Sequence, residues 1–416
     1  MGFRVLVLTL IAAGQEAAVR ALFPLPEVEG FNRVRYQLMA GTHPRFRATL
    51  RRGLVYDQVV VESRPDGFRE THRLNIYGFR SNDFAIDPPR GRGRILVIGD
   101  SVAEGQGAPE SATIAAELSR RTRNEPNPPE ILNLGVIAAN LPRLTLLTRD
   151  AVSLLRPTDV ILVLYANDLP SPPYLPSLDG PAAPVRRLQV EPWLPRLVVL
   201  TGQALADEPI HRRWPRRSIR FFPAVPDPAN PWTGAEKPPP NVQPRLFQEM
   251  RAGTLNPWLA EQSAALPGML RHDFATGGSP FPYLSRIRAI CRQANATLTI
   301  AYVPFCGVVH HHYAPSLEEL GMDPEIARAL SVDPLYHRQN EALRQACATL
   351  EVPLADATAD LRLAEEAGVR QYWEYDTHPR PSGYATIARR IHQEWRRGRD
   401  LREDRSPDPP SSAPSR

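Results

Sequence analysis

The chain has 416 residues, of which 42% are hydrophobic and 23% charged, as is typical of a globular protein with a substantial core. A net charge of +5 is small for this length and does not indicate a nucleic-acid partner. The three cysteines, at positions 291, 306 and 347, are too widely spaced for a disulfide framework or a CxxC zinc site. A single pairing between two of them stays open.

The N-terminus carries Arg4 and then an apolar run over residues 5–13. This run is shorter than the roughly 20 residues that a membrane-spanning helix needs. Its length, and the small residues at positions 12–14, fit a signal peptide. We expect residues 1–22 to be an export or anchoring segment, which would be the chain's one contact with a membrane. The alternative is a buried N-terminal strand or helix in a cytoplasmic protein.

Residues 23–90 form a β-rich extension in our interpretation, with short strands near residues 59–61. Residues 75–80 (NIYGFR) indicate a compact turn just before the first strand of the main sheet. The run Pro-Pro-Arg-Gly at residues 88–91 cannot continue regular structure, so we place a domain boundary there.

Residues 91–395 alternate between apolar strands and helical patterns. Strands that alternate with helices predict an α/β fold with a parallel sheet. The expected strands are 95–98, 131–135, 159–165, 297–303 and 352–356. The expected helices are 111–120, 141–155, 283–294, 334–350 and 382–395.

A long proline-rich insertion, about residues 169–280, interrupts this order. We expect loops and short helices that cover the site. Its basic-aromatic patch, residues 211–217, is most simply a solvated face, and contact with an anionic polymer or membrane surface is the alternative. The tail, residues 396–416, is polar and rich in Pro and Ser, which predicts disorder.

Polar residues follow several of the predicted strands at the point where each strand ends. In a parallel sheet these points share one edge, so the residues are expected to converge. Serine, histidine and aspartate with extra amide donors are the groups that acyl transfer needs. The residues are Ser101, Asn133 with Gly135, Asn167 with Asp168, and Asp376 with His378.

Four sequence blocks in this order resemble those of the SGNH hydrolase superfamily, the GDSL-type lipases and esterases. The blocks are Gly99-Asp-Ser-Val-Ala-Glu-Gly105, Asn133-Leu-Gly135, Ala166-Asn-Asp168, and Asp376-Thr-His-Pro379 with Gly383 behind it. The resemblance covers about residues 94–391. It implies a flavodoxin-like three-layer α/β/α fold with a central parallel sheet.

The resemblance also implies the role of each site residue. Ser101 would be the nucleophile, His378 the base and Asp376 the residue that orients the imidazole. The backbone N–H groups of Ser101 and Gly135 and the side chain of Asn167 would form the oxyanion hole. We therefore expect a serine esterase that uses no metal or organic cofactor and acts on a small-molecule or glycan O-acyl ester, such as an acetylated envelope polymer.

Two positions depart from the family pattern. Alanine stands at position 166, where the family usually has glycine, and one residue separates Asp376 from His378 where the family usually has two. The shorter spacing requires a different local turn. It is also compatible with a catalytically silent binding module, which we keep as an alternative beside an acyltransferase that uses the same triad.

Three adjacent histidines, residues 310–312, could suggest a metal site. Adjacent side chains cannot all point into one site, and no carboxylate pair has useful spacing, so a loop is the better interpretation. Asp100 is expected to support the turn after its strand rather than to act as an acid or base.

Overall fold

The computed structural model describes residues 77–169 and 278–403 without a break. It also describes residues 7, 11–18, 29–30, 55–60, 67–75, 232, 237–252, 255–256, 259–272 and 274. Most of the predicted export segment, the basic-aromatic patch at 211–217, much of the insertion and residues 404–416 lie outside this part.

The centre of the fold is a five-stranded parallel sheet with the strand order β5-β4-β6-β7-β8. This is the flavodoxin-like order, in which β4 and β6 flank the point where the chain reverses its direction across the sheet. The expected α/β fold with a parallel sheet is confirmed. The strands are β4 (Arg94–Gly99), β5 (Glu130–Gly135), β6 (Asp159–Tyr165), β7 (Thr297–Val303) and β8 (Leu354–Asp356).

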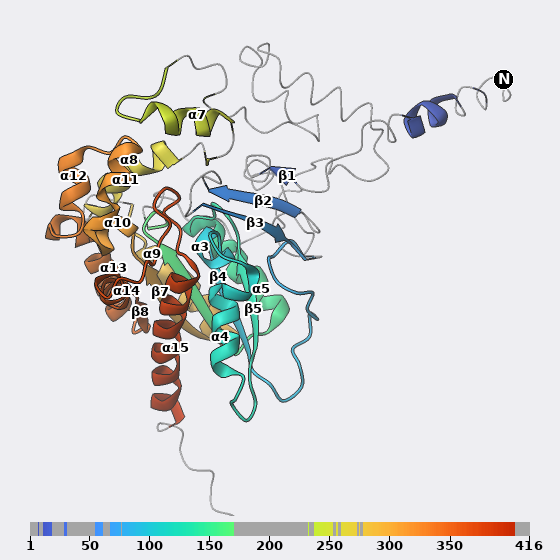
Figure 1. Cartoon of the computed structure of the whole chain (residues 1–416). Helices are drawn as coiled ribbons and strands as arrows, with labels where there is room; N and C mark the ends of the chain where they lie inside the picture. Colours follow the sequence, from blue (N-terminus) through green and yellow to red (C-terminus); the bar gives the residue numbers. More distant parts are fainter. Residues whose placement is uncertain are drawn as a thin grey trace, which may run out of the picture.

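Strands β4 and β6 are buried at every residue. Continuous runs of branched apolar side chains allow this, because helices cover both faces of the sheet and no face needs to be polar. One face packs against α5 (Leu141–Leu155), α9 (Phe281–Gln293) and α13 (Arg338–Thr349). The other packs against α4 (Ile114–Thr122) and α15 (Pro381–Glu403), which lie side by side in Figure 1. The domain is therefore a three-layer α/β/α sandwich.

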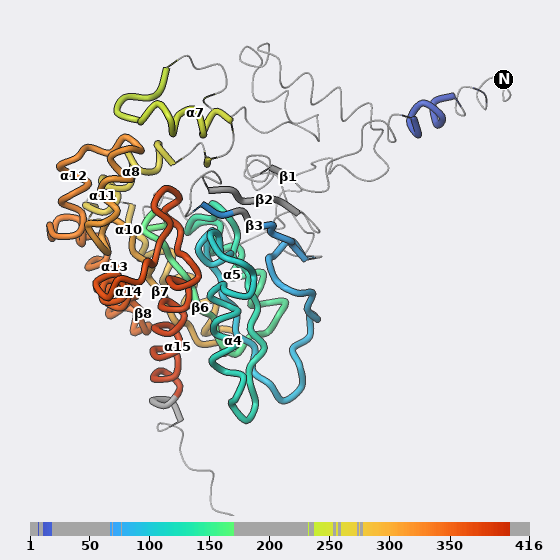
Figure 2. The backbone as a smooth tube through the Cα atoms, in the orientation of Figure 1, coloured from blue at the N-terminus to red at the C-terminus, as the bar shows by residue number. Residues whose placement is uncertain are grey.

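A second, three-stranded sheet precedes this domain in the chain. It comprises β1 (Glu29–Gly30), β2 (Val55–Val60) and β3 (Phe68–Arg73) in that order. In Figure 2 the light-blue chain between β3 and β4 runs down the side of the main sheet before it enters β4. Leu74, Phe79 and Phe84 of this segment belong to the same core as β4, β5 and α5, so the core continues across the predicted boundary at 88–91.

Arg94, the first residue of β4, fixes this segment against the sheet. Its guanidinium donates to the carbonyls of Ala85 at 2.9 Å, Ile86 at 2.7 Å and Leu155 at 3.0 Å. The side chain is fully buried and also pairs with Glu130. Arg94 therefore holds the preceding segment against the end of β4 that is opposite Ser101.

The described part of the insertion contains α7 (Pro244–Ala252) and α8 (Leu259–Leu270). Leu266 and Leu270 of α8 join the core on the α4 side of the sheet. The short elements that remain are α3 (Ser101–Glu104), η1 (Glu110–Ala112), α10 (Cys306–Val309), η4 (His311–Tyr313), α11 (Ala314–Glu319), α12 (Pro324–Ala329), η5 (Pro334–His337) and α14 (Thr358–Glu366). Within the residues described, no helix is both long enough and apolar enough to cross a bilayer.

The prediction of disorder from residue 396 onward is wrong for residues 396–403, because α15 continues to Glu403. Arginine and glutamate are good helix formers, so a polar composition alone does not end a helix. Side-chain contacts also hold the last turns of α15 in place. The Arg399 guanidinium lies 5.0 Å from the centre of the Trp395 ring and 3.7 Å from Glu125.

Candidate active site

Ser101 lies where β4 meets the short helix α3, at the edge of the sheet where the strand order reverses. Asp100 caps this helix, since its Oδ1 accepts a hydrogen bond from the Val102 N–H at 2.8 Å. Its predicted role in supporting the turn is confirmed. The Ser101 side chain is nearly buried, and its Oγ lies 2.9 Å from His378 Nε2 and 3.3 Å from Asp100 Oδ2. Because a hydroxyl has one proton, it donates to only one of these partners at a time.

His378 and Asp376 lie on the segment between α14 and α15, far from Ser101 in sequence. His378 Nδ1 contacts Asp376 Oδ1, while Nε2 faces the serine hydroxyl. Both side chains are buried. The structure therefore brings together Ser101, His378 and Asp376 in the spatial order that the predicted roles require.

The environment of His378 favours its charged form. Burial by itself lowers the pKa of the imidazole. The charge and hydrogen bond of Asp376, together with the charges of Asp100 and Glu104, outweigh this effect, so the pKa lies above its ordinary value of 6.5. Burial also raises the pKa of the Asp100 carboxyl. A proton that leaves the Ser101 hydroxyl would thus find an acceptor whose protonated form is stabilised by Asp376.

The single residue between Asp376 and His378 adopts an uncommon conformation. Thr377 has φ 65, in the left-handed region that β-branched residues rarely use. Backbone hydrogen bonds hold this turn, from the Thr377 N–H to the Trp373 carbonyl at 3.1 Å and from the Trp373 N–H to the His378 carbonyl at 3.0 Å. The different local turn that the short spacing requires is therefore present, and the surrounding structure holds it in place.

Gly135 lies beside the nucleophile helix, but its N–H already has a partner. It donates to Asn133 Oδ1 at 3.0 Å, and Asn133 Nδ2 donates to the Glu104 carbonyl at 3.2 Å. A Cβ on Gly135 would lie 2.0 Å from the Glu104 backbone nitrogen. The observed role of Gly135 is thus the close approach of β5 to α3. To act as an oxyanion donor, its N–H would first have to leave Asn133.

Asn167 lies in the turn that follows β6, the neighbour of β4. Asp168 holds this turn, since its Oδ2 accepts from the Tyr165 N–H at 2.9 Å. Burial and the nearby charge of Asp100 raise the pKa of the Asp168 carboxyl. The Asn167 Oδ1 atom is buried and has no hydrogen-bond partner within the part of the chain that the structure describes. This unpaired oxygen is an acceptor, whereas the predicted oxyanion role belongs to the Nδ2 donor of the same amide.

A cavity of about 260 Å³ opens beside Asn167. The turn after β6 contributes Tyr165 and Asn167 to its wall, and helix α8 of the insertion contributes the rest. The α8 residues are Glu261, Gln262, Ala265, Leu266 and Met269. The sequence analysis predicted that the insertion would cover the site. No motif indicated which of its residues would line a cavity.

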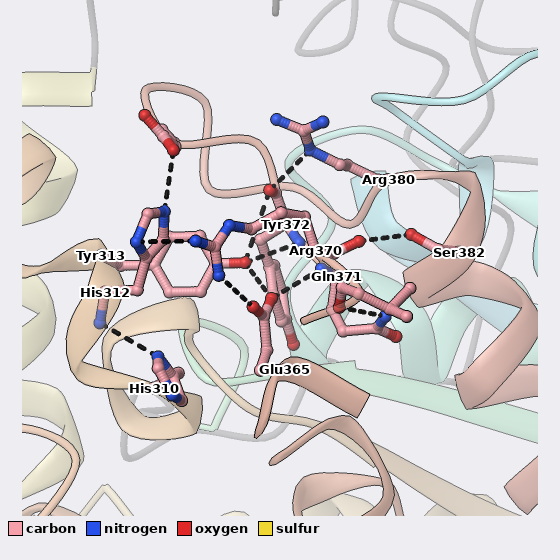
Figure 3. A network of polar contacts seen from close by, with 11 residues as sticks. His310, His312, Tyr313, Glu365, Arg370, Gln371, Tyr372, Arg380 and Ser382 are labelled. Atoms are coloured by element: carbon pink, nitrogen blue, oxygen red, sulfur yellow. Dashed lines mark hydrogen bonds and ion pairs between the residues drawn. The ribbon is translucent and has the colours of Figure 1, made fainter. Parts of the chain in front are cut away.

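A polar network ties the segment that carries Asp376 and His378 to helix α14 (Figure 3). Glu365 is its buried centre. One carboxylate oxygen accepts from the Gln371 N–H at 2.6 Å and from the Tyr313 hydroxyl, and the other accepts from Arg370 at 3.1 Å. The Tyr313 hydroxyl in turn accepts from the Tyr372 N–H at 3.0 Å. These contacts fix the start of the segment before it reaches Asp376.

His312, the last of the three adjacent histidines, belongs to the same network. Its Nδ1 accepts from Arg370 at 3.0 Å and its Nε2 contacts Glu374 at 2.8 Å (Figure 3). His310 Nδ1 accepts from the His312 N–H at 3.1 Å. Among the described residues, no group of three or more His, Cys, Asp or Glu side chains is arranged to hold a metal ion.

Comparison with known proteins gives structural neighbours alone, since neither a family model nor a curated protein matches the chain. The esterase EstA from Pseudoalteromonas sp. is 10% identical, with a TM-score of 0.35 over 74% of this chain and 99% of that one. An acetylxylan esterase, Axe2 from Geobacillus stearothermophilus, is 10% identical, with a TM-score of 0.35 over 73% and 93%. A protein from Slackia heliotrinireducens described as an SGNH hydrolase is 15% identical, with a TM-score of 0.31 over 73% and 100%. Two of these three neighbours are thus described as esterases and one as an SGNH hydrolase.

Proposed function

We propose that the protein is a serine hydrolase that cleaves O-acyl esters through an acyl-enzyme. The observation that carries this proposal is the contact of 2.9 Å between Ser101 Oγ and His378 Nε2, with Asp376 on the other imidazole nitrogen. A serine hydroxyl is a poor nucleophile until a base accepts its proton, and this arrangement supplies the base and its orienting carboxylate.

In the proposed reaction Ser101 Oγ attacks the ester carbonyl while His378 Nε2 takes the hydroxyl proton. Asp376 stabilises the imidazolium that forms. The same proton then passes to the departing alcohol oxygen, and the Ser101–acyl ester is left. Water, deprotonated by His378, releases the acid and restores Ser101.

The negative oxygen of the tetrahedral intermediate needs donors placed in advance. We assign this role to the Ser101 backbone N–H and the Asn167 side chain, with Gly135 as a third donor once its N–H leaves Asn133. The turn after β6 supports the assignment for Asn167, because Asp168 fixes the backbone of this turn and Asn167 lines the cavity.

The cavity beside Asn167 supports a short acyl group. Its volume of about 260 Å³ is below the roughly 300–1,000 Å³ of usual small-molecule pockets. Leu266, Ala265 and Met269 provide apolar surface, which suits a hydrocarbon chain, while Glu261 and Gln262 supply polar atoms. We therefore propose O-acyl esters of a small molecule or glycan as substrates, with an acyl group, such as acetyl, that fits within this cavity.

Labelling with a fluorophosphonate tests the proposal. The wild-type protein is expected to become labelled and to hydrolyse p-nitrophenyl acetate, and Ser101→Ala is expected to lose both. A fluorophosphonate reacts with a serine hydroxyl that a base activates, so the label should map by mass spectrometry to Ser101. Labelling that persists in Ser101→Ala would count against Ser101 as the nucleophile. A wild type that never reacts would count against a serine hydrolase and in favour of a silent binding module.

An acyltransferase would use the same residues, with a hydroxylated acceptor in place of water. Product analysis separates the two activities. A hydrolase releases free acid at the same rate with or without an added glycan, whereas a transferase forms acylated glycan at the expense of the acid.

A further inference from the structure

We propose that Arg80, in the extension that precedes the α/β domain, is a positioning residue for catalysis, and that residues 67–75 and 77–80 are part of the active-site frame. This inference rests on the proposed esterase function. It concerns the loop Gly105–Ala108, which follows the nucleophile helix and which we call the junction loop.

The junction loop is bonded directly to the backbone of the nucleophile. The N–H groups of Gly105 and Gln106 both donate to the Ser101 carbonyl, each at 3.0 Å. A shift of this loop therefore moves Ser101 itself.

Every carbonyl of the junction loop accepts a hydrogen bond from a side chain outside it. Arg80 donates from Nη1 to Gly105 at 2.6 Å and from Nη2 to Ala108 at 2.7 Å. The Tyr384 hydroxyl donates to Gln106 at 2.6 Å, and the Trp373 indole donates to Gly107 at 2.8 Å. Four consecutive carbonyls are thus held from two directions, by the extension on one side and by the segment around His378 on the other.

The second group of contacts connects the loop to the base. Trp373 and Tyr384 flank His378 in sequence, and the Trp373 N–H donates to the His378 carbonyl at 3.0 Å. Gly107 has φ 89, and a Cβ there would lie 2.7 Å from the Pro379 carbonyl and 2.9 Å from the Trp373 ring. The loop therefore packs directly against the residue that follows His378, so it sets the spacing between nucleophile and base.

Arg80 suits its position because its planar guanidinium holds several N–H donors in a fixed arrangement. The side chain is nearly fully buried, and two of its nitrogens bridge carbonyls three residues apart. A lysine is a point charge and cannot hold both carbonyls in the same fixed geometry. The turn before Arg80 is itself fixed, since Asn75 Oδ1 accepts from the N–H groups of Tyr77 at 2.9 Å and Phe79 at 3.1 Å.

Strand β3 of the extension contacts both the nucleophile helix α3 and the segment around His378. His72 Nδ1 lies 2.7 Å from Glu104 Oε1 on the nucleophile helix, and both side chains are fully buried. Phe68 stacks on Trp373 with ring centres 4.4 Å apart. The extension thus contacts the nucleophile helix, the junction loop and the segment around His378. These contacts are those expected of a frame that fixes the three segments relative to one another.

The test compares Arg80→Lys with Arg94→Lys. Arg94 is a matched control, because it is also a buried arginine that bonds carbonyls, but at the opposite end of β4. Both variants should lower the melting temperature. Since a misplacement of about 1 Å can cost about 10²-fold in rate, Arg80→Lys should lower kcat and the fluorophosphonate labelling rate about 10- to 100-fold, with KM unchanged within about twofold. Arg94→Lys should keep the wild-type kcat.

Equal kcat values in the two folded variants would overturn the positioning role. If Arg80→Lys does not fold, Tyr384→Phe decides, because it removes one hydrogen bond to the junction loop and should lower kcat about fivefold at constant KM. An unchanged kcat in Tyr384→Phe would then refute the proposal. A wild type without Ser101-dependent labelling refutes the esterase function instead, so the two failures are distinguishable.

Discussion

Only one residue separates Asp376 from His378, yet the carboxylate of Asp376 contacts Nδ1 of His378. Thr377 makes this contact possible by taking φ 65, which turns the chain sharply between the two side chains. His378 Nε2 is then left facing Ser101 Oγ. A spacing of one intervening residue therefore supports the carboxylate–imidazole contact, at the cost of backbone strain.

We expect Asp376→Asn to lower kcat/KM about 10²- to 10⁴-fold, the usual worth of general acid–base catalysis. The base must be neutral to accept a proton, and Asp376, with the charges of Asp100 and Glu104, holds the pKa of His378 above 6.5. Wild-type kcat/KM should therefore rise with pH through this raised pKa. In the variant burial still lowers the pKa, but the carboxylate no longer opposes it, so the rising limb should move to lower pH. A pH profile of p-nitrophenyl acetate hydrolysis measures both effects, and a limb that stays in place would show that Asp376 does not set the pKa.

Thr377→Gly is expected to keep activity and to stabilise the fold slightly. Relief of strain at φ 65 is worth about 1–3 kcal/mol. The extra flexibility of glycine, about 0.5–1 kcal/mol, and the loss of the buried threonine side chain offset part of this gain. The free energy of unfolding should rise, or stay within about 0.5 kcal/mol of the wild-type value, in urea titrations. A large fall in stability together with lost labelling would mean that the threonine side chain, rather than the turn, holds the triad.

The strands and the approximate site could be predicted because both depend on local signals. Runs of branched apolar residues marked β4 and β6, and the parallel sheet then placed Ser101 and Asn167 at one edge. The compact turn before Arg80 was also visible in the sequence. The role of Arg80 could not be predicted, because it donates to backbone carbonyls of a loop more than twenty residues later. Backbone carbonyls occur at every residue, so no sequence pattern identifies them as partners.

The partner of Gly135 could not be predicted for a related reason. Its N–H donates to Asn133 two residues earlier, and whether an asparagine bonds its own chain or a substrate depends on the side-chain torsions. The last turns of α15 include a contact of Arg399 with the Trp395 ring, which composition does not encode. Polar composition therefore suggested disorder where packing supports a helix.

Gly135→Ala should disrupt the site through the backbone. The new Cβ would lie 2.0 Å from the Glu104 nitrogen and 2.5 Å from the Ala103 carbonyl carbon, neither of which can rotate away. We expect a loss of about 1–3 kcal/mol in stability or more, as for an overpacked core, and strongly reduced labelling of Ser101. Gly268→Ala is the control, because no atom lies within 4 Å of its Cβ and the position is helical. It should be neutral or stabilising, and a Gly135→Ala variant as active as Gly268→Ala would contradict the close approach.

The cavity beside Asn167 predicts how acyl length governs activity. Ala265→Trp should fill the cavity from α8 and exclude longer acyl chains while it still admits acetyl. Each buried methylene is worth about 0.8 kcal/mol, so the ratio of kcat/KM for p-nitrophenyl hexanoate to that for the acetate should fall at least about tenfold. The measurement is a series of p-nitrophenyl esters from acetate to hexanoate on purified variants.

Ala264→Trp is the matched control for this series. It adds the same side chain to the same helix at an exposed position that is not part of the cavity wall, so it should leave the acyl-length profile unchanged. If Ala265→Trp slows all acyl lengths equally but responds to the size of the alcohol, the cavity holds the alcohol part of the ester. In that case acyl length must be selected elsewhere, and the proposal of a short-acyl pocket formed by α8 is wrong.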